Sequence, residues 1–409
     1  MFGNQSDAII RNLFSEACWA EEEARIKGAE IGRAFYENTV TIGALGKQFF
    51  PAKRFSGADL ISLPIYSTVI NKITNSMRNE IYYEKDAKID ALYSKYDLDN
   101  VMNIAMKNSL MTGSTSLWLE KSDDKLCINN WNPWYTFKLF SEDGKNVIGY
   151  MKRYVIDNQS LLSPLVKSGS NAIEYIEIVS SDNKWVIYQD GKPFYDENYN
   201  MPMMPVVWFD SIDMDDDNRY GIPFVDRFKN ILIALNQLLT SSQRMMLCLP
   251  NTWYTTKDFQ DSDNEISIRP DMINYVGSDK ELAQTARELD LNEEKDFIEK
   301  YINSIYESSQ LPPKEILSGA GKVESGIALS IIYSSFISLI SSISTYGQRK
   351  EAELIKALYF MEYGRELKDF EVKWTNNILP KDRDADLRYY TTLFDKNIIT
   401  ADELKDKLI

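Results

Sequence analysis

The sequence has no histidine, few cysteines and no long apolar run, and each of these absences excludes a class of function. Without histidine, the chain lacks the commonest general base and the commonest metal ligand of proteins. Cys18, Cys127 and Cys248 are far apart in apolar surroundings, so they predict buried thiols in a reducing compartment instead of disulfides or a zinc site. We therefore expect no cofactor and no metal.

Membrane insertion and secretion are not indicated either. No apolar run reaches the ~18 residues that a membrane-spanning helix needs. The first residues, "MFGNQSDAII", lack the basic start and the apolar core of a signal peptide. The sequence predicts a soluble, cytoplasmic protein.

Positive charge is also in short supply. The 409 residues include 46 Lys and Arg against 61 Asp and Glu, which gives a formal net charge of −15. A protein that holds nucleic acid neutralises its phosphates with a basic stripe. A chain this acidic could surround a polyanion without binding it tightly. The length of the chain allows two or three domains.

The glycine-rich stretch "EILSGAGKVESGIALS" at 315–330 raises the question of a nucleotide site. A phosphate-binding loop needs G-x-x-x-x-G-K-[ST]. Here Ile316 stands where the first glycine belongs, and Val323 stands where the hydroxyl belongs. The stretch therefore predicts a mobile connector, with Ser325 as the cap of the helix that follows.

The acidic stretch "DSIDMDDDNRYG" resembles a calcium loop at first sight. Asp213, Asp215 and Asp217 alternate as in an EF-hand, but Asn218 replaces the required glycine and Phe224 the closing glutamate. We favour a solvated loop over a metal site.

Hydrophobic periodicity predicts an α+β fold. Helical patterns fill residues 1–110, including a stripe of Ile65, Val69, Ile73 and Met77 and a helix that ends at Gly113. Alternating patterns at 114–210 predict a mostly antiparallel sheet region, with a hairpin turn at Asp143-Gly144. We assign the aromatic cluster Trp131, Trp134 and Tyr135 to the core of this region.

Longer helices follow the sheet region. One is predicted from Ile222 to about Met246 and a second over 292–310, separated by a small strand-and-turn insert. From Gly326 to Gly364 few residues break a helix, so we predict one continuous helix with a kink at Gly347. A short strand in "DFEVKWTN" and two small helices complete the pattern.

Several stretches, taken in order, carry a resemblance to a known family. They are "AMKNSLMTGSTSLWLE", "INNWNPWYTFKLF" with "VIGYMKRY", "NRYGIPFVDRFKNILIALNQLLTSS", "VESGIALS" and "NNILPKDRDADLRYYTTLFDKNIITADELKDKL". Together they resemble the portal protein of tailed double-stranded DNA bacteriophages. The turn at 397–400 departs from the family pattern because it lacks a glycine.

The resemblance implies a portal-like division of the chain. The implied parts are a helical and antiparallel-sheet wing (1–220), a first stem helix (221–249), a clip (250–291), a second stem helix (292–310), a tunnel loop (311–325), a long spine helix (326–364) and a short helical crown (365–409).

The resemblance also implies a function without catalysis. Portal subunits form a ring, usually of twelve, at one vertex of the capsid, and DNA is packaged and ejected through its channel. The implied partners are other copies of the chain, double-stranded DNA, the terminase motor, the head–tail adaptor, and the major capsid and scaffolding proteins. The protein would be assembled in the host cytoplasm and end in the virion as its head–tail connector.

Three groups of site residues follow from this resemblance. Lysines of the tunnel loop would centre DNA, aromatic residues of the clip would face the motor and adaptor, and apolar residues would pack the stem. The alternative is that the lysines are merely solvated and that part of the clip aromatics, Trp253 above all, pack the clip itself. The groups are Lys314, Ser318, Gly319, Gly321 and Lys322 in the tunnel loop; Trp253, Tyr254, Lys257, Phe259 and Tyr275 in the clip; and Val225, Phe228, Leu232, Leu235, Leu239 and Tyr301 in the stem.

Two other functions remain as alternatives. A helical scaffolding or assembly protein would show heptads sustained over long stretches, and the predicted sheet region opposes that. A carboxylate enzyme without histidine is conceivable, but adjacent acids such as Glu293 and Glu294 lie in charge-rich stretches with no partner base.

Overall fold

The structure is a computed structural model that describes residues 16–51, 60–162, 173–248, 291–312 and 331–375, together with residues 378 and 391. Short gaps within these ranges fall at 85, 123–124, 142–143, 145, 158–159, 200 and 216–218. The predicted helices near the C-terminus and the predicted insert between the two long helices lie outside the described residues.

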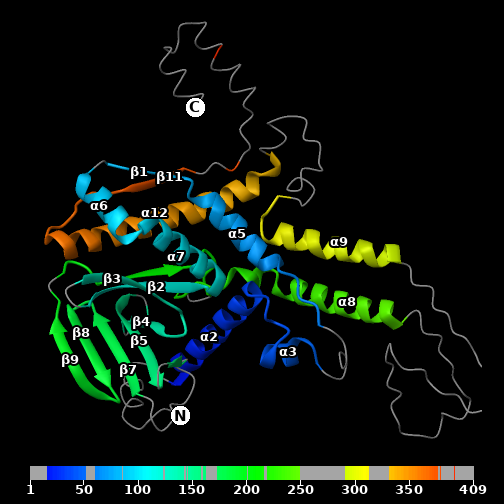
Figure 1. Ribbon diagram of the computed structural model, residues 1–409, viewed down its shortest axis with the longest axis horizontal. Coiled ribbons are helices and arrows are strands. Elements are labelled where there is room, and N and C mark those ends of the chain that lie inside the picture. The colour runs from blue at the N-terminus through cyan, green and yellow to red at the C-terminus, as the bar shows by residue number, and fades with distance from the viewer. Residues whose placement is uncertain are drawn as a thin grey trace, which may run out of the picture.

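Helices make up most of the upper part of the molecule, and two of them, α8 and α9, extend from it at the right of Figure 1. α12 lies against α5, α6 and α7, and α2 crosses beside α7. The bounds are α2 (Glu16–Tyr36), α3 (Gly43–Phe49), α5 (Ile65–Met77), α6 (Ala87–Tyr96), α7 (Leu98–Thr112), the 3-10 turn η1 (Phe224–Arg227), α8 (Lys229–Cys248), α9 (Leu291–Ser308) and α12 (Ser334–Tyr363).

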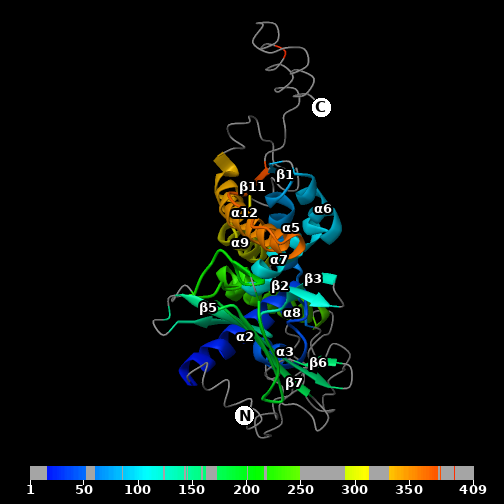
Figure 2. The same cartoon turned by 90° about the vertical axis from the view of Figure 1, so that its left-hand side faces the viewer.

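The strands β2 to β10 form two antiparallel sheets below α5, α6 and α12, as Figure 2 shows from the side. The larger sheet has the order β4-β5-β7-β8-β9, with β6 paired to β5, and the smaller has the order β10-β2-β3. The bounds are β2 (Ser114–Ser122), β3 (Lys125–Trp131), β4 (Thr136–Phe140), β5 (Val147–Asp157), β6 (Ser160–Leu162), β7 (Ile173–Ser180), β8 (Lys184–Gln189), β9 (Lys192–Asn198) and β10 (Val206–Asp210). The α+β class and the antiparallel region predicted for 114–210 are confirmed.

A third sheet joins distant parts of the chain. β1 (Glu80–Tyr83) pairs antiparallel with β11 (Val372–Thr375), and both lie over the helices. β11 is the short strand predicted in "DFEVKWTN". Its pairing ties the segment after α12 back to the segment after α5.

The predicted helical stripe and its stop signal are confirmed. α5 buries Val69, Ile73 and Met77 at four-residue steps, and α7 ends at Gly113. Gly113 has φ of +90°, and a Cβ there would lie 2.5 Å from the carbonyl oxygen of Gly221. Glycine therefore lets the turn into β2 approach residue 221 closely.

The helix predicted from Ile222 begins later than expected. Residues Phe224–Arg227 form a 3-10 turn, and α-helical structure starts at Lys229. Pro223 precedes this turn with an extended ψ of 134° and has no N–H group. Its ring also disfavours a helical conformation at Ile222, so the apolar periodicity extends further than the helix.

The predicted continuous helix from Gly326 is interrupted by a turn near its start. A turn at Tyr333 precedes α12, which starts at Ser334, and residues 326–330 lie outside the described part. α12 then runs through Gly347 without interruption. A Cβ at Gly347 would lie 2.1 Å from the ring of Trp374, so this glycine allows close packing; the kink expected there stays a prediction.

Three apolar clusters hold these layers, the smallest of them around Trp118, Val179 and Val206. The largest unites α5, α6, α7, α12 and the start of α8 with β2 and β10. The second lies between α2 and the large sheet and contains Trp134 and Tyr135, with Trp131 packed against it. The prediction that these aromatics belong to the core is confirmed. Cys127 is half-buried, although we expected a buried thiol.

None of the helices in the described ranges is long and apolar enough to span a bilayer.

Candidate functional site

The α8–α9 helix pair is the candidate functional site because it projects from the body and part of the pair's own apolar surface is uncovered. The two helices lie side by side at the right of Figure 1. Their free ends flank residues 249–290, which are outside the described residues. What the pair can do depends on how it is anchored and on what its outer half exposes.

The start of α8 is anchored in the body's own core. Phe228, Leu232 and Leu235 are at most 1% exposed. Tyr66 packs its ring edge against Phe228, and its hydroxyl donates to the carbonyl oxygen of Leu110 at 3.0 Å. Val225 in the preceding turn is fully buried as well. These four predicted stem residues pack within their own chain.

An ion pair holds the turn that precedes α8. Nε and Nη2 of Arg227 donate to the two carboxylate oxygens of Asp213, at 2.6 and 2.7 Å. Asp215 accepts from the backbone N–H groups of Arg219 and Tyr220. Two acids of the predicted solvated loop thus bind their own chain.

The same loop gives no support to a calcium site. Within the part of the chain that the structure describes, no group of three acidic, cysteine or histidine residues is placed to hold a metal. Asp217 and Asn218 lie outside that part.

Polar side chains of α8 fasten the segment that precedes α5. The amide oxygen of Asn236 accepts from the N–H of Leu63 at 3.1 Å, and the hydroxyl of Thr240 accepts from the N–H of Ile61 at 3.0 Å. Asn236 is 1% exposed. These contacts explain a polar residue inside an apolar stripe, and they mark where α8 leaves the body. The sequence signal was Asn236 itself, which periodicity alone cannot assign to a partner.

Beyond Asn236, the apolar side chains of the pair are less buried, although Thr240 and Ser242 remain covered. Leu239, Tyr301 and Ile302 are half-buried, and Phe297 is 56% exposed with the ammonium group of Lys300 5.4 Å from its ring centre. An apolar stripe that is buried at one end and exposed to solvent at the other is suited to packing against a further surface. The role of Leu239 and Tyr301 in packing between copies stays a prediction.

The joint between the sheets and the helices is polar and closely bonded. The carboxylate of Asp210 accepts from the ammonium of Lys138 at 2.8 Å and from the indole N–H of Trp208 at 2.9 Å. The backbone N–H of Asp210 donates to the hydroxyl of Tyr346 on α12 at 2.7 Å. Burial lowers the pKa of Lys138, and the carboxylate of Asp210 opposes that effect.

A second buried network joins α5, α6, α12 and β11 around Glu351, which is 0% exposed. Its carboxylate accepts from Nη2 of Arg78 at 2.6 Å, from the hydroxyl of Tyr93 at 2.9 Å and from the indole N–H of Trp374 at 2.5 Å. The sequence did not reveal this network, because its members are up to 296 positions apart.

These buried charges are matched in pairs, which is the arrangement of a rigid support. Lys152 illustrates this: its ammonium contacts the carboxylates of Glu120 and Glu177 at 2.7 and 2.9 Å. Desolvated charges of this kind contribute rigidity only when both partners are present.

The predicted tunnel-loop and clip residues lie outside the described residues, so these predictions stay untested. They are Lys314, Ser318, Gly319, Gly321 and Lys322 in the tunnel loop and Trp253, Tyr254, Lys257, Phe259 and Tyr275 in the clip.

Comparison with known proteins finds distant structural likeness and no sequence match. No protein-family model and no curated protein matches the chain. A chain from a structure titled "Virion of native gene transfer agent (GTA) particle" is 11% identical, with a TM-score of 0.47; the match covers 94% of this chain and 98% of that one.

A chain from "Neck of native GTA particle computed with C12 symmetry" is 10% identical, with a TM-score of 0.43; the match covers 88% of this chain and 93% of that one. With so few identical residues and so loose a superposition, function has to be derived from the residues of the chain itself.

Proposed function

We propose that the chain is a portal protein that assembles into a ring, through which double-stranded DNA is packaged into and ejected from a virus particle. The observation that carries the proposal is the α8–α9 pair. The pair is anchored in the body at one end and half-exposed at the other, and its outer ends flank residues 249–290. The order of the sequence stretches that resemble portal proteins supports the same function.

Ring closure would cover the exposed stripe of the pair. In a cyclic assembly each copy offers one surface to the next and receives the complementary surface from the previous one. Leu239, Phe297 and Tyr301 would then pack against neighbouring stem helices. A single copy leaves them in contact with water.

Charge supports a conduit in preference to a DNA-holding protein. Twelve copies with a net charge of −15 would carry −180. Tight phosphate contacts would slow the movement of DNA, whereas a mostly acidic ring repels it. Lys314 and Lys322 of the tunnel loop would supply a loose positive ring that centres the duplex.

The remaining parts take the roles that the resemblance implies. Residues 1–220 form the wing, 250–291 the clip, 326–364 the spine and 365–409 the crown. The clip, with Trp253, Tyr254, Lys257, Phe259 and Tyr275, would dock the terminase motor and later the head–tail adaptor. The protein itself would hydrolyse no ATP.

An elongated helical scaffold has less support. α8 and α9 have 20 and 18 residues within the described part of the chain. Their inner halves pack on a body that contains three sheets. A heptad-based filament needs a seam several times longer.

The test is the oligomeric state of the purified chain, alone and together with capsid and scaffolding proteins. Negative-stain microscopy should show rings with a central hole, and mass photometry should give a mass near twelve times 47.2 kDa. Open filaments, or a monomer under both conditions, would overturn the proposal. Hydrolysis of ATP by the pure protein at the rate of a motor would overturn its non-enzymatic part.

A further inference from the structure

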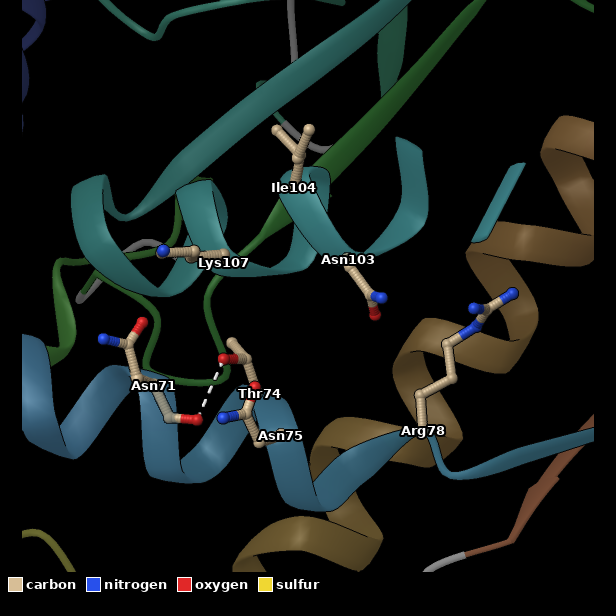
Figure 3. Close-up of a pocket in the computed structure, with 7 residues that line it drawn as sticks. All are labelled: Asn71, Thr74, Asn75, Arg78, Asn103, Ile104 and Lys107. Carbon is tan, nitrogen blue, oxygen red and sulfur yellow. Dashed lines mark hydrogen bonds between the residues drawn. The ribbon is translucent and has the colours of Figure 1, made fainter. Parts of the chain in front are cut away.

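A polar groove between α5 and α7 differs in charge from the rest of this acidic chain. Its volume is about 470 Å³. Figure 3 shows Asn71 and Asn75 on α5 facing Asn103 and Lys107 on α7. Spacings of four residues on each helix put each pair of side chains on one face. Thr74, Arg78 and Ile104 complete the lining.

The groove offers hydrogen-bond donors and positive charge, and none of its lining residues is acidic. Lys107 lies 4.8 Å from the ring centre of Tyr36 and forms no ion pair within the described residues. Asn71 already accepts a hydrogen bond from the Tyr36 hydroxyl through its amide oxygen, so its amide N–H groups are available to a ligand. An anion is the group that such a lining stabilises.

Arg78, at one end of the groove, has a donor to spare. Nη2 of its guanidinium pairs with Asp99 at 2.8 Å and Glu351 at 2.6 Å. The Arg78 side chain is 3% exposed. Its Nε is buried and has no hydrogen-bond partner among the described residues. Unpaired buried donors of this kind are uncommon.

The shape and the rim favour a side chain on a polypeptide over a free ion. Ile104 is 43% exposed at the groove. A small anion would leave this apolar rim in water, whereas a protein segment would cover it. A DNA backbone would need a longer basic stripe, and here Lys107 is the one lining cation without a carboxylate partner.

We propose that this groove receives carboxylate side chains of a neighbouring copy of the same chain. The inference rests on the proposed ring, because it needs a second copy. Each copy is acidic, so adjacent copies repel one another unless some acids of one meet cations and amide donors of the next. The α5–α7 groove is a place on the described surface that provides both.

Charge-changing variants in the groove test the proposal. Lys107→Glu and the isosteric Asn103→Asp should each raise the concentration at half-assembly, measured by mass photometry without nucleic acid, by about fivefold or more. Lys72→Glu is the matched control: it makes the same charge change on α5, and Lys72 is exposed but does not line the groove. The control should shift assembly by less than about twofold. Thermal melting by circular dichroism verifies that each variant is folded.

Cross-linking identifies the partner directly. Rings made from equal parts of nitrogen-15-labelled and unlabelled chains are treated with a carbodiimide, which joins lysines to carboxylates without a spacer. Mixed-label peptides that link Lys107 to an Asp or Glu are expected. Lys107→Gln should remove them, and Lys72→Gln should not.

Each outcome decides something. Rings that assemble equally well with Lys107→Glu and give no mixed-label link at Lys107 would overturn this proposal and leave the portal proposal standing. Failure of the natural chain to form rings under any condition would overturn both. Normal assembly combined with weaker retention of a DNA duplex by Lys107→Glu would assign the groove to nucleic acid and overturn the carboxylate ligand.

Discussion

The helical body and the outer half of the α8–α9 pair are built from the same kind of amphipathic helix, but they differ in what covers the apolar side. α12 buries 13 of its 30 residues inside its own chain. In α9, Ile305 is the one fully buried apolar residue among those whose side chains are described, and Phe297 is mostly exposed. The apolar side of the body is covered by its own chain, whereas part of the apolar side of the pair stays exposed.

This division separates stability from assembly. Substitutions in the body should act on the free energy of unfolding of one chain. Substitutions in the outer pair should act on association between chains, because little of their surface is buried before that.

Removing Glu351 should be the most damaging change in the body. Glu351→Ala leaves Arg78 buried without a main partner and removes an acceptor from Trp374, so we expect a loss of about 3–5 kcal/mol. Urea unfolding followed by circular dichroism measures it. Glu353→Ala is the control, since Glu353 pairs with Lys350 at the surface and should cost less than about 0.5 kcal/mol. Equal losses of unfolding free energy in the two variants would contradict a special stabilising role of the buried Glu351 carboxylate.

A matched pair of leucines on α8 tests the boundary between the two regions. Leu232→Ala should cost about 3 kcal/mol, because the side chain is 0% exposed in the core. Leu239→Ala, one turn beyond Asn236, should cost less in the single chain and should instead weaken the ring. Urea midpoints and mass photometry of both variants give the comparison. If Leu239→Ala destabilises the monomer as much as Leu232→Ala, the boundary lies further out.

The body should lose stability at alkaline pH. Burial raises the pKa of Tyr66 and of Tyr220 well above the ordinary value of 10.0. Their contribution is fully present below pH 10 and decreases above it, because the unfolded chain then releases protons that the folded chain retains. Each should remove about 1.4 kcal/mol per pH unit in that range.

Single phenylalanine substitutions test this pH dependence. Tyr66→Phe should make the loss above pH 10 less steep, although it costs about 1 kcal/mol at neutral pH through the lost hydroxyl contacts. Unfolding midpoints between pH 8 and pH 11 decide the matter. An unchanged slope in both Tyr66→Phe and Tyr220→Phe would exclude these residues as the cause.

Phe297→Ser should change the unfolding free energy least, by less than about 0.5 kcal/mol, because the side chain is 56% exposed. Its effect should appear as fewer rings at a given protein concentration. Lys300→Ser is the control on the same helix, because it removes the cation beside the ring and leaves the apolar ring itself in place. Normal assembly of Phe297→Ser would remove this residue from the proposed interface.

The parts of the fold that could be predicted are those specified by nearby residues. The stripe on α5, the stop at Gly113 and the alternation of the strands each depend on spacings within one element. The packing role of Gly347 could not be predicted, because the ring of Trp374 that lies against it is 27 positions away in the sequence.

The polar features of the site were harder to predict for the same reason. Asn236 was noticed as a polar residue in an apolar stripe, but its partner, the N–H of Leu63, is a backbone group that any residue could supply. Glu351 was not singled out, since nothing in its neighbourhood indicates burial. The roles of Asn236 and Glu351 depend on partners that are distant in sequence, and hydrophobic periodicity gives no information about such partners.

The pairing of β1 with β11 has a consequence for the order of events during synthesis. Residues 80–83 leave the ribosome long before residues 372–375. At about 5–20 residues per second the interval is on the order of tens of seconds. For most of that time Arg78 lacks Glu351, and once Gly347 is translated it lacks the ring of Trp374 until 27 further residues follow. A nascent chain therefore cannot close its body early, and closure of the body after translation of β11 would delay subunit association until each copy is nearly complete.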